Sequence, residues 1–327
     1  MPTFCRHNRF LANCPICSPE TASGGRASTS GPGPGAAGST GAERSTAGAT
    51  TLPRGRSRRL GAKDMRVRQV ARSPEDGFQS GLLPGLRASA DARRLAEEIA
   101  FSVARLDELS RDPPGLYGVI AGEPDDEHAF LLAFLIAYLS PLEDPDDPWR
   151  AIRTAAASDP PSLGGAETGP RGVHRPENGT RTLGAYLAWA QRSGSQSAAF
   201  FGEGGWSAER RFARALERLA LPAFPRAARF ELLVSLGRLG RCELRAGTLA
   251  LGGADETTIA AKRVFGIADV LLLERRSAAL AEALGIPLEA LDLALYNWDA
   301  GDRRATLGSR ATASPTLVEE LALALGL

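Results

Sequence analysis

Cysteine and histidine are scarce in this sequence, which has four cysteines and three histidines among 327 residues. So few cysteines do not make the disulfide framework of a secreted protein, and we expect a reducing, cytoplasmic environment. No apolar run approaches the roughly 18 residues that a membrane-spanning helix needs. The first residues also lack the apolar core of a secretory signal. The net charge of +1 indicates no partner by itself, so charge has to be considered locally.

Several catalytic and cofactor motifs are also missing. The chain contains no Walker phosphate loop, no Rossmann glycine fingerprint and no G-x-S-x-G nucleophile motif. We therefore expect no redox or nucleotide cofactor. His128 and His174 have no visible Ser, Cys or Asp partner in the sequence, so we assign them no catalytic role.

Composition divides the chain into three parts. Residues 19–64 consist mainly of Gly, Ser, Ala, Thr and Pro, with almost no large apolar side chain. Such a segment cannot bury enough surface to offset its ordering entropy, so it is predicted to be a flexible, disordered linker. It joins a short segment, 1–18, to a predicted folded domain, 65–327.

Hydrophobic periodicity predicts that this domain is all-α. From Asp91 onward apolar residues recur at three- and four-residue steps, and either Ser89 or Asp91 could cap the helix. Residues 126–140 are apolar nearly all round, which predicts a buried helix, and a short helix is expected at 148–157. In all, seven to ten helices are expected. Two segments differ: 158–180 is rich in turn formers and is predicted to be a mobile insertion, and 242–253 alternates like a strand, with a helix as the alternative.

The first residues carry a pattern typical of a metal site. Cys5, His7, Cys14 and Cys17 form C-x-H-x6-C-x2-C. Zinc prefers four such ligands in a tetrahedron, and a C-x2-C pair supplies two thiolates from one tight turn. A segment this short could not fold without a metal. We predict a structural zinc knuckle, against the alternative of an unstructured tail with incidental thiols.

Local charge points to nucleic acid at one place before the helical region. Eight Lys or Arg residues and one Asp lie between Arg54 and Arg72. Such a stretch can neutralise phosphates. A solvated tail that aids solubility is an equally good interpretation of this segment alone.

The region from Leu219 to Asp269 combines a turn with an acidic pair. A helix ends in a Leu-Pro turn, a second helix begins near Arg226 and Arg229, and Asp255-Glu256 opens a later helix. In helix-hairpin-helix proteins such a hairpin grips a phosphate of DNA. A carboxylate that follows it in DNA glycosylases stabilises the sugar cation and orients water. Alternatively, the acidic pair only caps its helix, which the helix dipole favours.

Two further clusters follow in the same half of the chain. Lys262 and Arg263 could contact phosphate, or pair with acids on the surface; a Schiff-base role for the lysine is less favoured. Asn297 and Trp298 combine an amide with an aromatic ring, a pair that can read and stack on a base. Core packing is the alternative for Trp298.

These segments together resemble a known family, the α-glutamyl/putrescinyl thymine pyrophosphorylases of clade 3. The resemblance lies in CRHNRFLANCPIC, DGFQSGLLPGLRASADARRLAEEIAF, FLIAYLSPLEDPDDPW, ETTIAAKRVFGIAD and ALDLALYNWD. The family is similar to helix-hairpin-helix DNA glycosylases, and a relative removes glucosylated hydroxymethylcytosine from viral DNA. The resemblance implies hydrolysis of the N-glycosidic bond of bulky modified bases in phage DNA, as an antiviral defence.

The resemblance also implies roles for single residues. Asp255, with Glu256 as second choice, would be the catalytic acid. Arg226, Arg229, Lys262 and Arg263 would hold DNA phosphates, and Asn297 and Trp298 would line the base pocket. The chain departs from the usual L-P-G-[VI]-G hairpin, because Leu221-Pro222-Ala223-Phe224-Pro225 has neither glycine. A non-catalytic DNA-binding adaptor, or a transferase or pyrophosphorylase of thymine hypermodification, is the alternative.

Overall fold

The computed structural model describes residues 73–327. In this part of the chain every regular element is helical, as the periodicity predicts. The first six α-helices are α1 (Ser89–Arg111), α2 (Leu116–Gly122), α3 (Asp126–Leu139), α4 (Arg150–Ala156), α5 (Gly179–Gln191) and α6 (Gln196–Phe201). They are followed by α7 (Ala208–Arg218), α8 (Arg226–Arg238), α9 (Glu256–Phe265), α10 (Val270–Leu284), α11 (Ala290–Ala300), the 3-10 turn η3 (Gly301–Arg303) and α12 (Pro315–Leu325).

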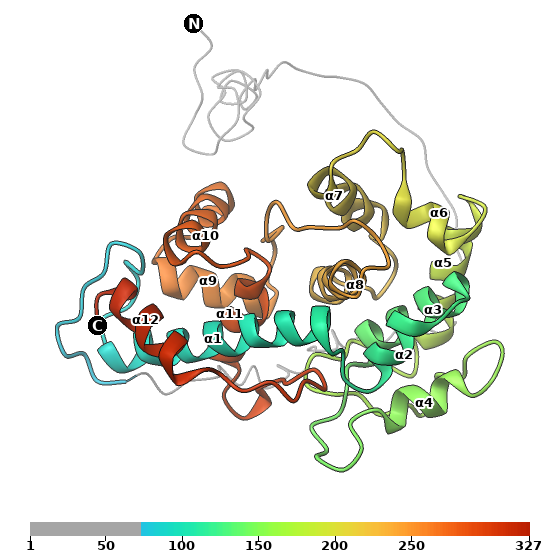
Figure 1. Ribbon diagram of the computed structural model, residues 1–327, viewed down its shortest axis with the longest axis horizontal. Coiled ribbons are helices and arrows are strands. Elements are labelled where there is room, and N and C mark those ends of the chain that lie inside the picture. Colours follow the sequence, from blue (N-terminus) through green and yellow to red (C-terminus); the bar gives the residue numbers. More distant parts are fainter. Residues whose placement is uncertain (1–72) are drawn as a thin grey trace, which may run out of the picture. The chain divides into compact units, whose positions relative to one another are not determined.

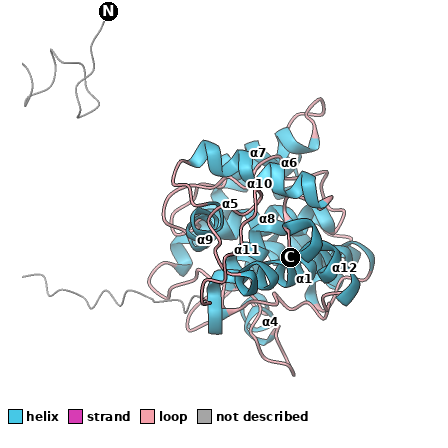
Figure 2. Ribbon diagram, turned by 90° about the vertical axis from the view of Figure 1, so that its left-hand side faces the viewer, coloured by secondary structure: helices cyan, strands magenta, loops and turns pink. Residues whose placement is uncertain are grey.

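The described part has more helices than the seven to ten that the sequence suggests, and Figure 2 shows them joined by loops. The predicted zinc ligands Cys5, His7, Cys14 and Cys17, the linker 19–64 and the basic stretch to Arg72 lie outside the described residues. Among residues 73–327, no group of His, Cys, Asp or Glu side chains is placed to hold a metal ion. No helix in the same range is long and apolar enough to cross a bilayer.

Helix α1 connects the two ends of the described domain. Its Leu95, Ile99, Leu106 and Leu109 are buried, which confirms the predicted amphipathic face. The helix packs mainly against α11 and α12 and also touches α8. In Figure 1, α1 extends across the molecule from the side where α9–α12 lie to the side where α2–α8 lie. We call these sets the two groups of helices.

The predicted cap of α1 is wrong. Ala88 occupies the N-cap position and both Ser89 and Asp91 lie inside the helix. The Asp76 carboxylate instead accepts hydrogen bonds from the Ser89 backbone N–H, at 3.0 and 3.1 Å. A residue from the preceding loop thus satisfies the free donor, which a local sequence pattern does not reveal.

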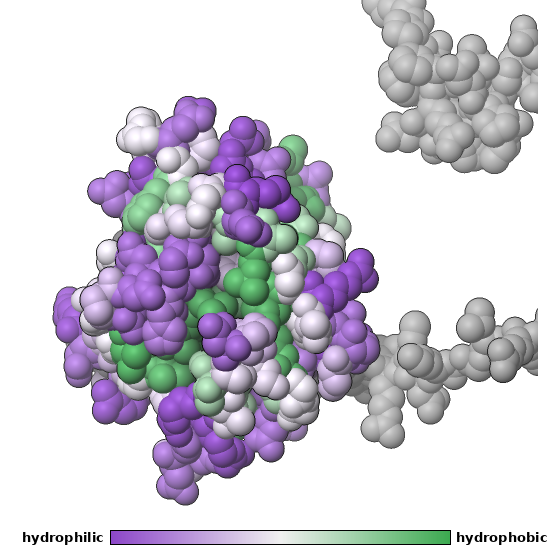
Figure 3. Space-filling view, turned by 90° about the vertical axis from the view of Figure 1, so that its right-hand side faces the viewer, coloured by the Kyte–Doolittle hydropathy of each residue, from purple (hydrophilic) through white to green (hydrophobic). Residues whose placement is uncertain are grey.

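Helix α3, in the α2–α8 group, is buried along most of its length, as its apolar residues predict. It packs against α2, α4, α6 and α8. Phe134 of α3 stacks on Tyr186 of α5, with ring centroids 4.0 Å apart. Figure 3 shows the side of the molecule that lies at the right in Figure 1. Hydrophobic side chains are visible there among hydrophilic ones.

The strand-like segment 242–253 forms neither a strand nor a helix. Its alternation holds in two stretches: Leu244 and Ala246 are buried, and Leu249 and Leu251 are buried after a break at the exposed Gly247 and Thr248. The Glu274 carboxylate of α10 accepts hydrogen bonds from the backbone N–H groups of Leu249 and Leu251. A side chain thus takes the place of a partner strand, so the same alternation occurs in an extended loop.

The turn-rich segment 158–180 packs onto α3. The backbone N–H of Val173 donates to the carbonyl of Tyr138 at 2.9 Å, and that of Gly169 donates to Leu139 at 3.0 Å. Arg171 is 8% exposed. The segment therefore brings side chains into the body of the domain, where they form part of the site described next.

Candidate functional site

As predicted, one helix ends before the Leu-Pro turn and another begins after it: α7 and α8 are joined by a short turn at Leu221–Pro225, which we call the hairpin. The Phe224 N–H donates to the Leu221 carbonyl at 3.2 Å. Ala223 has a φ of 53°, in the left-handed region that favours glycine. The hairpin thus has a glycine-type conformation at Ala223, where the usual L-P-G-[VI]-G sequence has its first glycine.

The acidic pair lies at the start of α9. Asp255 is the N-cap, and its carboxylate accepts from the backbone N–H of Thr258 at 3.2 Å and from the Thr258 hydroxyl at 2.6 Å. The alternative that the acid caps its helix is therefore correct in structural terms. Glu256 is about half exposed and forms an ion pair with Arg303. Thr258 thus holds the Asp255 carboxylate, while Glu256 lies at the surface beside Arg303, which is itself half exposed.

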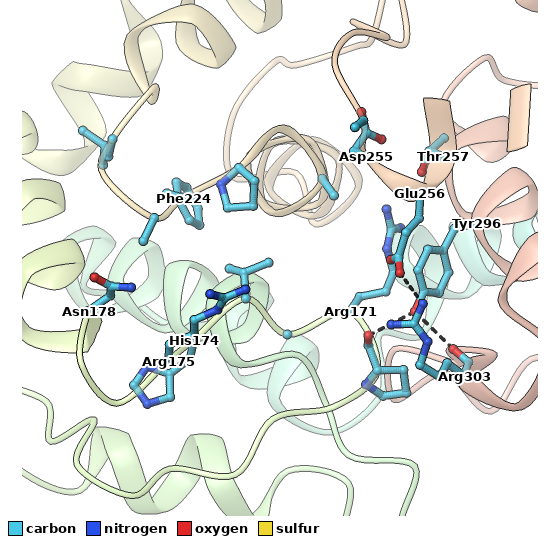
Figure 4. A pocket seen from close by; sticks show the side chains of 18 residues that line it. Arg171, His174, Arg175, Asn178, Phe224, Asp255, Glu256, Thr257, Tyr296 and Arg303 are labelled. Atoms are coloured by element: carbon cyan, nitrogen blue, oxygen red, sulfur yellow. Dashed lines mark hydrogen bonds and ion pairs between the residues drawn. The ribbon is translucent and has the colours of Figure 1, made fainter. Parts of the chain in front are cut away.

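The hairpin and the acidic pair line one cleft of about 670 Å³. Residues 170–175, Asn178, Tyr296 of α11 and Arg303 of η3 also line it. In Figure 4, Asp255 and Glu256 lie on one side of this space and Phe224 of the hairpin lies on the other. The cleft is thus formed where the two groups of helices meet.

A buried ionic network stands behind the acidic side of the cleft. Arg226 contacts Asp255 at 3.0 Å and Asp292 at 2.8 Å, and Arg171 contacts the other oxygen of Asp292 at 2.7 Å. Burial alone would raise the pKa of Asp292, but Arg226 and Arg171 overcome it and lower the pKa below its ordinary value. Two arginines and two aspartates therefore balance one another, and they connect α8, α9, α11 and the 158–180 segment.

The four predicted phosphate-binding residues lie in different surroundings. Arg226 is nearly buried in this network, and Arg263 pairs with Asp299 at the far end of α9. Lys262 is half-buried beside Arg263. Arg229 is half-buried, and its guanidinium donates to the Leu216 carbonyl at 2.7 Å. These four side chains do not gather on one surface, and Arg226 alone among them contacts the acidic pair.

The predicted base-pocket residues lie in the core and do not line the cleft. Asn297 donates to Glu98 at 3.1 Å, and the Trp298 indole N–H donates to the Asp91 carbonyl at 2.9 Å. Successive residues of a helix point about 100° apart, so α11 presents Tyr296 to the cleft and its two neighbours to the core. The core-packing alternative thus describes Trp298.

Sequence reasoning missed three residues of the cleft wall, Arg171, Tyr296 and Arg303. Arg171 stacks over the Tyr296 ring at 4.7 Å, and the Tyr296 hydroxyl donates to the Arg303 carbonyl at 3.2 Å. Arg171 and Arg303 belong to no local motif, whereas Tyr296 lies within ALDLALYNWD. In the sequence, Tyr296 directly precedes Asn297 and Trp298, the predicted base-pocket pair, and this position was the one indication of its role.

Comparison of the chain with protein-family models, with curated proteins and with solved structures found no match. The functional interpretation therefore depends on the cleft, on its chemistry and on the sequence resemblance described above.

Proposed function

We propose that the protein is a DNA N-glycosylase that removes bulky modified bases, such as glucosylated hydroxymethylcytosine or a hypermodified thymine, from phage DNA. The main support is the shared cleft, in which the hairpin between α7 and α8 and the acidic pair at the start of α9 both form the wall. A pocket of about 670 Å³ has room for an extruded, enlarged nucleoside. Cytoplasmic location and a structural zinc in segment 1–18 remain predictions from the sequence.

The proposed reaction is hydrolysis at C1′ of the modified nucleotide. The bond between C1′ and the base nitrogen breaks, and its electron pair leaves with the base. The carboxylate of Asp255 stabilises the cationic sugar and orients a water molecule. The water oxygen bonds to C1′ and its proton is transferred to the departing base, which leaves an abasic site. Glu256 is the second candidate for the carboxylate.

The network behind the cleft supports this assignment of Asp255. Thr258 and Arg226 hold the carboxylate in one orientation, and its side chain remains 18% exposed. A catalytic group needs such a fixed geometry. Because the same contacts would also serve a purely structural cap, the decisive experiment has to remove the charge and keep the cap.

Asp255→Asn meets this requirement, since Asn and Asp are equally good N-cap residues. Wild-type protein incubated with DNA containing the modified base should produce alkali-labile abasic sites and free base. Asp255→Asn should reduce the rate by about 10²-fold or more, while Glu256→Gln tests the second candidate. Asp269→Asn is the matched control, because Asp269 caps α10 through a 2.9 Å hydrogen bond from Leu272 and does not line the cleft.

Three outcomes would contradict the proposal. If wild type binds modified DNA but forms no abasic sites, the protein is a non-catalytic DNA-binding adaptor. Release of diphosphate without free base would indicate a pyrophosphorylase. If Asp255→Asn and Glu256→Gln both keep the wild-type rate, neither carboxylate is the catalytic group.

A further inference from the structure

A second pocket of about 640 Å³ lies between α7, α8 and the loop 247–252. We call it the α7–α8 pocket. None of its lining residues lines the cleft, although its Arg226 contacts Asp255 of the cleft wall. Phe212 and Leu216 form an apolar side, while Arg229 and Arg210 provide positive charge.

The acids of this pocket are matched by arginines outside its lining. Glu209 pairs with Arg245, and Glu217 pairs with Arg214 at 2.9 Å. Neither arginine lines the pocket. Glu209 and Glu217 therefore have arginine partners outside the lining, and they do not form ion pairs with Arg210 or Arg229.

Arg229 has no carboxylate within ion-pair distance among residues 73–327. Its contact is the Leu216 carbonyl, and its Nε is buried with no hydrogen-bond partner in the described part of the chain. Burial, and secondarily the nearby Arg226 guanidinium, lower the pKa of Arg229. A half-buried cation without a counter-ion is costly, and an anion from outside the chain would offset that cost.

Arg210 adds a second cation at the pocket. It is exposed, stacks over Trp206 at 5.2 Å, and forms no ion pair with any described residue. Two guanidinium groups beside an apolar surface match a phosphate group attached to an organic body, since arginine forms paired hydrogen bonds to phosphate.

We propose that the α7–α8 pocket binds a phosphate ester, with the phosphate against Arg229 and Arg210 and the organic part against Phe212 and Leu216. This site is separate from the proposed glycosylase reaction, and its test does not use that reaction. The phosphate could belong to a free nucleotide or to a DNA strand, and the experiment below distinguishes the two.

The full-length chain is titrated calorimetrically with thymidine 5′-monophosphate, with inorganic phosphate and with a short DNA duplex. Arg229→Gln removes the charge. Ala213→Phe narrows the pocket from the exposed side of α7 without breaking a side-chain hydrogen bond. Arg218→Gln is the matched control, because Arg218 is exposed on the same helix and does not line the pocket. Thermal unfolding of each variant verifies that it is folded.

Saturable binding of the monophosphate that weakens at least tenfold in Arg229→Gln and in Ala213→Phe, but not in Arg218→Gln, supports a free phosphate ester. If the monophosphate does not bind and duplex binding shows the same pattern, the phosphate comes from DNA. If both pocket variants match Arg218→Gln with every ligand, the proposal is overturned. Since Ala213→Phe leaves Arg229 intact, a folding defect of Arg229→Gln would not decide the result.

Discussion

At the scale of single residues, Asp292 has the clearest consequence for stability. It is 2% exposed and it carries the charge that Arg226 and Arg171 both contact. Removing one partner from a buried ionic group leaves uncompensated charge, which costs about 3–5 kcal/mol. We expect Asp292→Asn to lower the free energy of unfolding at neutral pH by that amount, measured by denaturant titration.

The lowered pKa of Asp292 also predicts a pH dependence. A carboxyl whose pKa is lower in the folded chain stabilises the fold fully above its unfolded value, here 3.8, and this stabilisation is lost as pH falls through the folded pKa. Wild type should therefore lose stability below about pH 4, and Asp292→Asn should lose less in that range. Equal pH profiles of the two proteins would show that Asp292 does not carry this effect.

Ala223 is the residue that departs most clearly from the hairpin pattern. Its φ of 53° is strained for alanine and is accessible to glycine. We expect Ala223→Gly to raise the free energy of unfolding by roughly 1 kcal/mol. In contrast, Ala213→Gly at an exposed position within α7 should lower it by about 1 kcal/mol. Unfolding curves of both variants check the prediction; destabilisation by Ala223→Gly would contradict it.

At the scale of elements, the end of α9 depends on a close contact with Gly85. A Cβ added at Gly85 would lie 2.0 Å from the Arg263 carbonyl oxygen and 2.5 Å from the Gly266 backbone nitrogen. Gly85→Ala must therefore displace backbone, and we expect a loss of about 1–3 kcal/mol in the free energy of unfolding. Gly81→Ala, in the same loop with nothing within 4 Å, should cause no such loss. Equal unfolding midpoints would contradict this contact.

Elements were also what the sequence predicted best. The helices predicted from Asp91 onward, at 126–140 and at 148–157 correspond to α1, α3 and α4 within two residues at each compared end, because each buries apolar residues of its own. The segment 242–253 shows the limit of such reasoning. Its inward and outward alternation is correct on each side of a break at 247–248. Whether a strand forms depends on a hydrogen-bonding partner, however, and here Glu274 of α10 provides it.

At the scale of the whole molecule, the cleft shows which part of a site local patterns can indicate. The hairpin and the acidic pair are local features, so the sequence identified them. Arg171 and Asp292 are 121 positions apart and meet through the packing of the 158–180 segment on the helices. No sequence spacing predicts such a pair. The same reason applies to Asn297, whose environment is set by Glu98 of α1.

A buried polar contact joins α1 to α2 and α8. Arg105 of α1 is 2% exposed and donates to Glu231 of α8 and, at 3.2 Å, to the Tyr117 hydroxyl of α2. Burial, only partly offset by Arg105, raises the pKa of Tyr117 to about 12, so this hydroxyl stays neutral at physiological pH. The contact therefore consists of one charge pair and a neutral hydroxyl that accepts from the arginine.

A double-mutant cycle tests whether this pair works as a unit. Arg105→Met and Glu231→Leu should each lower the free energy of unfolding by about 3–5 kcal/mol, because each leaves a buried charge alone. The double variant should regain much of the loss, since it leaves neither charge unpaired. Denaturant unfolding of the four proteins gives the coupling energy. If the two losses simply add, Arg105 and Glu231 do not stabilise one another, and other contacts hold α1 against α8.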